Sequence, residues 1–270
     1  MPLSAATDAQ EAKYLKHIFN SLTLATNGTF RLALFSVAPT SEVDGTGGTE
    51  IPAANGYGRI TITNDTSAWN TGTVATPSIK TNKIAFTWAC ATANWAANVV
   101  GWGLYLNDNT TLAHYQALPS AIAMTIGDTL TFAAGALSIS VNFSSDFTSS
   151  KMADLIFGAT TWASPVALVF KAYSTALTPS GSGTELSGSG YASVSLTSSG
   201  NWTTATAGTN SNSVSVAFPA AVGANWLPVQ AIGLWSGSDL VWCCNLTSPV
   251  QVNIGNILKI AAGGAVTTLD

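Results

Sequence analysis

The apolar positions near the start of the chain recur with the period of a helix. Four of them follow the spacing i, i+3, i+4, i+7 and therefore share one face. They are Leu15, Ile18, Phe19 and Leu22. This pattern predicts a helix over residues 7–22, which Thr7 or Asp8 can cap. Halfway along the chain, Met152, Leu155 and Ile156 form a second such stripe. It predicts a helix over residues 149–160, with Gly158 as its end.

After each predicted helix the pattern changes to that of β-strands. The segments are short, rich in β-branched and aromatic residues, and separated by Gly, Pro, Asn and Asp. In the first half they read RLALFSVA, GRITIT, KIAFTWA, VVGWGLYL, AHYQAL and LTFAAGALSISV. Parallel strands would need crossover helices between them, and the pattern contains none. The sequence therefore predicts a mainly β fold of antiparallel, jelly-roll-like β-sandwiches, each preceded by one short helix.

The second half of the chain repeats the first. The stretch ANWAANVVGWGLY at residues 93–105 returns as ANWLPVQAIGLW at 224–235. Other blocks return in the same order: the offset is 135 residues between Glu50 and Glu185, and 128 between Asp128 and Asn256. Blocks that keep their order indicate tandem copies of one folding unit. We expect two domains, residues 1–144 and residues 145–270.

Composition changes the picture of the surface more than that of the fold. Hydrophobic residues make up 47% of the chain and charged residues 8%, with a net charge of −4. Soluble domains carry about 25% charged residues, so this chain resembles a subunit whose surface is covered by neighbours. The sequence has no cluster of Lys and Arg, which argues against nucleic acid as a partner. No apolar run is long enough for a membrane helix, and we expect synthesis in a cytoplasm.

Candidate chemistry is sparse. His17 falls on a polar helix face and His114 in a strand, and neither returns in the second half. The three cysteines have no zinc-binding spacing, and Asp108, between two asparagines, has too few acidic neighbours for a calcium loop. We therefore expect no catalytic, cofactor-binding or metal-binding residues, and no enzyme activity.

The residues that both halves share are the remaining candidates. Glu50 and Glu185 occupy the same Gly-Thr-Glu turn, where we expect a structural role in which the carboxylate accepts backbone N–H bonds. Aromatic residues in polar loops can contact a protein partner or stack on sugar rings. Those in equivalent positions are Trp69 and Trp202, together with Tyr57 and Tyr191. Trp95 and Trp226 keep strict spacing, which favours core positions.

These blocks resemble a known family. LALFSVAPT, GGTEI, NGYGRI and MTIGDTLTFAAGALSISV are similar to a small domain of tailed-bacteriophage structural proteins, commonly labelled tail-fibre or minor virion proteins. The resemblance covers residues 8–141 and, more loosely, 149–266. The second copy has Ala192 and Ser193 where the first has an Arg after Gly-Tyr, which suggests a different neighbour. The resemblance implies a virion protein and no catalytic residues.

From the near absence of charge and of fibrous repeats, we expect a decoration or cement protein on the capsid exterior. Its partners would be other virion proteins, the major capsid protein first, and we expect a homo-oligomer, a trimer by analogy with shell symmetry. Two alternatives stay open. One is a tail-fibre or baseplate-associated protein that binds the host surface, and the other is a carbohydrate-binding module.

Overall fold

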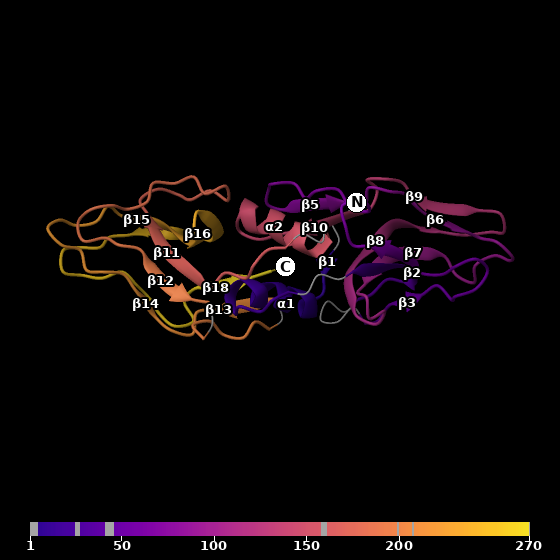
Figure 1. Cartoon of the computed structure of the whole chain (residues 1–270), viewed down its shortest axis with the longest axis horizontal. Helices are drawn as coiled ribbons and strands as arrows, with labels where there is room; N and C mark the ends of the chain where they lie inside the picture. Colours follow the sequence, from indigo (N-terminus) through magenta and orange to yellow (C-terminus); the bar gives the residue numbers. More distant parts are fainter. Residues whose placement is uncertain are drawn as a thin grey trace.

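A computed structural model of the chain describes residues 5–24, 28–40, 46–157, 161–198, 200–206 and 208–269. The described chain is mainly β, and its paired strands run antiparallel. Each half has one helix, which precedes all of its strands except the two-residue β1 (Ala5–Ala6) (Figure 1). The expected fold class of tandem antiparallel β-units is therefore confirmed.

The first unit contains one helix and ten strands among its described residues. They are β1 (Ala5–Ala6), α1 (Asp8–Phe19), β2 (Thr29–Val37), β3 (Thr49–Glu50), β4 (Ile60–Thr63), β5 (Ser78–Thr81), β6 (Phe86–Ala89), β7 (Val99–Tyr105), β8 (Leu112–Ile122), β9 (Thr129–Phe132) and β10 (Ser138–Val141). The main sheet has the order β1-β8-β7-β2-β3, with β4 also paired to β2. Two smaller pairs, β6–β9 and β5–β10, complete the unit.

The second unit repeats this pairing. It contains α2 (Asp146–Phe157), β11 (Ala167–Tyr173), β12 (Val194–Thr197), β13 (Thr209–Ser211), β14 (Val216–Ala217), β15 (Val229–Ser236), β16 (Asp239–Val250), β17 (Lys259–Ile260) and β18 (Val266–Thr268). The main sheet is β12-β11-β15-β16, and the pairs β14–β17 and β13–β18 match β6–β9 and β5–β10.

The repeated Ala-Asn-Trp and Gly-Leu stretches have the same structural role in both units. Trp95 Nε1 donates to the carbonyl of Asn55 at 3.2 Å, and Trp226 Nε1 donates to that of Ser189 at 2.9 Å. Both indoles are buried, as expected. At Gly103 a Cβ would lie 2.7 Å from a Leu112 methyl, so the close packing beneath the strand requires glycine. Repetition here reflects packing.

The two helices lie between the units, in the middle of the molecule, and the main sheets lie toward opposite ends (Figure 1). Each helix begins against its own unit. The Thr7 amide, just before α1, donates to the Ala113 carbonyl in β8 at 3.1 Å, and Thr148 Oγ1 in α2 donates to the Val241 carbonyl in β16 at 2.8 Å. Beyond these starts, each helix packs against strands of the other unit: α2 contacts β5 and β10, and α1 contacts β13.

The last turn of each helix makes the aromatic contacts with the other unit. Phe157, at the end of α2, stacks on Phe30 of the first unit with ring centroids 5.4 Å apart and lies 5.2 Å from Trp69. Phe19, at the end of α1, lies 4.5 Å from Trp202 of the second unit. One continuous buried cluster therefore includes residues of both halves.

Polar contacts reinforce the exchange at α2. The ammonium of Lys80, in β5 of the first unit, lies 2.5 Å from Asp154 in α2, and the Lys80 side chain is almost completely buried. Asn64 Nδ2 of the first unit donates to the Ile156 carbonyl at 2.7 Å. The division between residues 144 and 145 stays a prediction. One small sheet of each unit packs against the helix that comes from the other half of the chain: β5 and β10 against α2, and β13 against α1.

The helix boundaries differ from those predicted. α1 ends at Phe19, and Leu22 lies beyond it and is exposed. Thr7 is the N-cap residue, but its hydroxyl donates to the Leu112 carbonyl at 3.3 Å, so it makes no side-chain cap. His17, expected on a polar face, is buried. α2 begins at Asp146, three residues earlier than predicted, and Gly158 lies outside the described residues.

Candidate functional site

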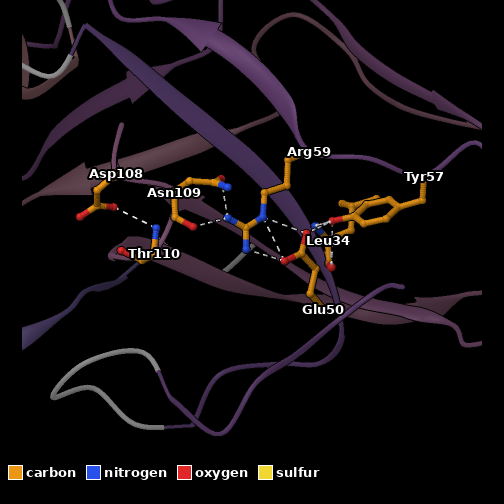
Figure 2. Close-up of polar contacts among 7 residues, drawn as sticks. All are labelled: Leu34, Glu50, Tyr57, Arg59, Asp108, Asn109 and Thr110. Carbon is orange, nitrogen blue, oxygen red and sulfur yellow. Dashed lines mark hydrogen bonds and ion pairs between the residues drawn. The ribbon is translucent and has the colours of Figure 1, made fainter. Parts of the chain in front are cut away.

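The residues shared by both halves meet in a polar cluster at the edge of the first main sheet. Glu50 lies in β3, and Tyr57 and Arg59 lie in the segment that leads into β4. The Tyr57 hydroxyl donates to Glu50 Oε1 at 2.6 Å (Figure 2). Arg59 Nη2 lies 2.6 Å from Glu50 Oε2, and its Nε lies 3.0 Å from both carboxylate oxygens. This is a bidentate, charge-assisted pair.

The cluster is connected to the backbone on both sides. The Leu34 amide in β2 donates to the Tyr57 hydroxyl at 3.0 Å. Arg59 Nη1 donates to the carbonyl and side-chain oxygens of Asn109, at 2.7 and 2.6 Å. The guanidinium also lies over the Tyr105 ring, 3.8 Å from its centroid. Arg59 therefore ties β3 to the β7–β8 turn.

The turn that presents Asn109 is fixed by Asp108. The Asp108 carboxylate accepts the amides of Thr110 and Thr111 at 2.9 and 2.8 Å, and the Thr111 hydroxyl at 2.5 Å. These hydrogen bonds, the Thr111 hydroxyl first, lower the pKa of Asp108 to about 2. Asn109 then adopts a positive φ of 61°. The oxygen-rich stretch is thus a turn between β7 and β8, and it positions a partner for Arg59.

Burial and charge keep the cluster in one protonation state. Burial raises the pKa of Tyr57 well above its ordinary value, and the hydrogen bond to Glu50 raises it further. The hydrogen bond to Glu50 raises the pKa of Arg59. Because the phenol stays neutral and the guanidinium stays charged, the cluster is suited to bracing the sheet edge rather than to proton transfer.

The second unit builds the same cluster with a different cation. The Tyr191 hydroxyl donates to Glu185 Oε1 at 3.1 Å and accepts the Ala172 amide at 2.9 Å. Lys171, in β11, lies 3.1 Å from Glu185 Oε2 and over the Trp235 ring at 5.1 Å. The positive charge that Arg59 supplies in the first unit is therefore supplied in the second by Lys171, which lies in a different strand. Aligning the two halves of the sequence could not show this.

The structural role of Glu50 and Glu185 stays a prediction, and their partners differ from those expected. The carboxylates accept hydrogen bonds from tyrosine hydroxyls and pair with Arg59 or Lys171, instead of accepting backbone N–H bonds. A cleft of about 640 Å³ opens beside the first cluster, lined by Arg31, Ile51, Pro52 and Ala53 together with the cluster residues. Among the described residues, no group of three His, Cys, Asp or Glu side chains could hold a metal ion.

The loop tryptophans, for which the sequence leaves core and exposed positions equally open, are both buried. Trp69 is 1% exposed and Trp202 is 4% exposed, because the end of the helix exchanged from the other unit covers each indole. Tyr57 is 7% exposed, and Tyr191 is half-buried within its cluster. At this burial, the rings of Trp69, Trp202 and Tyr57 leave no face free for a sugar or a partner.

Both histidines are buried within the fold. His114 lies in β8 with its ring centroid 5.1 Å from that of Phe157, and its Nε2 lies 3.1 Å from the Tyr14 hydroxyl. Burial lowers the pKa of His114 to about 3, so the imidazole is neutral near neutral pH. Burial also lowers the pKa of His17. Within the described part of the chain, no helix is long and apolar enough to span a membrane.

Comparison with known proteins gives the setting. The family described as podophage GP4 fiber I protein gp80 matches residues 5–140 and again residues 144–268. The chain belongs to this family. Each match contains one helix and the strands that follow it. Neither a curated protein nor a solved structure matches the chain. Membership in the gp80 family identifies a phage virion structural protein, which confirms the resemblance found in the sequence.

Proposed function

We propose that the protein is a non-enzymatic fibre subunit of a podophage virion. The observation that carries the proposal is the family match, which covers both units and describes a fibre protein. The shape supports it, because two sandwiches lie at opposite ends of an elongated body joined by packed helices (Figure 1). Such a body offers two separate surfaces to neighbouring virion proteins.

The polar clusters support a structural rather than a catalytic role. In both units a carboxylate, a tyrosine and a cation are bonded to one another and to the backbone. A general base or nucleophile needs a group that is free to exchange a proton with a substrate. These groups instead brace β3 at the edge of the first main sheet and the segment around Glu185 beside the second.

A capsid decoration protein is the second candidate. The low charge content of 8% favours it, because broad uncharged contacts suit a subunit that lies between shell proteins. The major capsid protein would then be the partner, and a trimer at a threefold position the expected oligomer.

Copy number in purified particles separates the two roles. A fibre subunit is expected at about six to eighteen copies per particle, because fibres follow the symmetry of the tail. A decoration protein is expected at hundreds. Quantitative mass spectrometry against the major capsid protein measures this ratio. Failure to find the protein in particles that infect normally would refute both roles.

A further inference from the structure

The cleft beside the first polar cluster contains a positive charge that the cluster does not use. Its charged lining residues are Arg31, Glu50 and Arg59. Arg59 is paired with Glu50. Arg31, in β2, is half-buried, and its Nη1 donates to the neutral hydroxyl of Thr61. Among the described residues, no carboxylate lies within ion-pair distance of Arg31. The cleft therefore carries one spare positive charge.

The repeat shows that the strand does not require this arginine. Arg31 pairs with Tyr105, the residue after the repeated Gly-Leu, and Val169 pairs in the same way with Trp235 in the second sheet. Val169 therefore corresponds to Arg31, and a β-branched residue serves there as a strand residue. The cation of the second unit, Lys171, is paired with the glutamate of that unit. The spare charge is thus an addition of the first unit.

The remaining lining of the cleft combines a hydrogen-bond donor with apolar groups. The Asn109 side-chain oxygen accepts from Arg59, whereas its Nδ2 has no hydrogen-bond partner in the part of the chain that the structure describes. Ile51, Pro52 and Ala53 supply apolar surface, and the last two are exposed. The volume of about 640 Å³ lies within the range of about 300–1,000 Å³ that is usual for small-molecule sites.

The charge of the cleft selects the ligand. A guanidinium binds a carboxylate through two parallel hydrogen bonds, and one spare positive charge matches a monoanion. A phosphate monoester carries up to about two negative charges near neutral pH. The second charge would face Glu50 without a further cation to compensate it. The lone carboxylate of an aspartate or glutamate side chain would leave most of the volume unfilled.

We propose that this cleft binds an acidic sugar residue of the hexuronic acid class. The sugar carboxylate pairs with Arg31, and a ring hydroxyl accepts from Asn109 Nδ2. The apolar face of the ring lies against Pro52 and Ala53. This binding site goes beyond the proposed fibre role and does not depend on it, because one copy of the chain supplies every group.

Titration of the isotope-labelled full chain with sodium glucuronate, followed by NMR at low salt, tests the proposal. We expect a dissociation constant on the order of 1 mM, as is usual for a ligand of this size. The shifts should fall on the amide of Ala53 and on the side-chain resonances of Arg31 and Asn109. Glucose, which lacks the carboxylate, and glucose 6-phosphate should each bind at least tenfold more weakly.

Substitutions at Arg31 give the matched controls. Arg31→Val introduces the residue of the second unit, so it should leave the midpoint of thermal unfolding near that of the wild type. It should weaken glucuronate binding at least tenfold. Adding Val169→Arg restores the net charge of the chain away from the cleft, and this double variant should bind as weakly as Arg31→Val. If Arg31→Val does not fold, Arg31→Gln removes the charge, keeps a donor for Thr61 and should show the same loss.

The outcomes separate this inference from the proposed function. Equal glucuronate affinity in the wild type and Arg31→Val, or equal affinity for glucose and glucuronate, would overturn the site. Tighter binding of glucose 6-phosphate would overturn the choice of a carboxylate. Self-association of the wild type that Arg31→Val abolishes, without glucuronate binding, would assign the cleft to a second copy of the chain. Absence of the chain from particles would instead refute the fibre role and leave the sugar site standing.

Discussion

Phe157→Ala tests whether the helices stabilise each other's units. Phe157 belongs to the second half of the chain, yet its ring lies among Phe30, Trp69 and His114 of the first unit, at 5.4, 5.2 and 5.1 Å. The side chain is completely buried. Truncating a buried phenylalanine costs about 3–5 kcal/mol, and the three aromatic neighbours place this site toward the upper end. We therefore expect a loss of about 5 kcal/mol in the free energy of unfolding.

Urea unfolding, monitored by tryptophan fluorescence, measures the loss in the free energy of unfolding. The dependence of that free energy on urea concentration, the m-value, should stay unchanged. Hydrogen exchange then shows where the loss falls: protection should decrease in β2 and β4 of the first unit. Phe147→Ala is the control, because it removes a half-buried ring from the same helix; its cost should be about 1 kcal/mol. Decreased protection confined to residues 161–269, with β2 and β4 unaffected, would refute the exchange.

Three further predictions follow from buried groups. On acidification from pH 6.5 to 5, the free energy of unfolding should fall with a slope that rises from about 0.7 to about 1.3 kcal/mol per pH unit, because the unfolded His114 binds a proton that the folded one, with a pKa of about 3, does not. His114→Gln should remove most of this slope in urea titrations, and an unchanged slope would contradict the assignment. Asp154→Ala should cost about 3 kcal/mol, because it leaves the Lys80 ammonium buried and unpaired; calorimetry should show recovery when Lys80→Met is added. Trp95→Phe should cost about 1 kcal/mol more than Trp69→Phe, because Trp95 Nε1 donates to a carbonyl and Trp69 Nε1 has no partner; equal melting temperatures would contradict this.

The sequence was sufficient for the repeat, the strands and the position of each helix. These features depend on local periodicity and on blocks that return in order, such as the Ala-Asn-Trp stretch. It could not show which sheet each helix covers. Both helices carry an apolar stripe and both small sheets need one, so the pattern fits packing within a unit as well as exchange between units.

The burial of the loop tryptophans could not be decided from the sequence for a similar reason. Trp69 and Trp202 lie in loops rich in Asn, Thr and Ser, which left exposure open, but their neighbours Phe157 and Phe19 come from distant positions. The similar spacing of the two tryptophans, 12 residues after Tyr57 and 11 after Tyr191, was the available signal for a core role. The structure also gives an offset that the blocks do not show. The amides of Leu34 and Ala172 both donate to the repeated tyrosine, so the offset in this strand is 138 residues (172 − 34), against 135 between Glu50 and Glu185.

The virion role itself is tested most directly by cryo-electron microscopy of the intact phage. The account predicts copies of this elongated two-unit body in the fibres. Maps and mass spectra of infectious particles that contain no copy of this chain would contradict it.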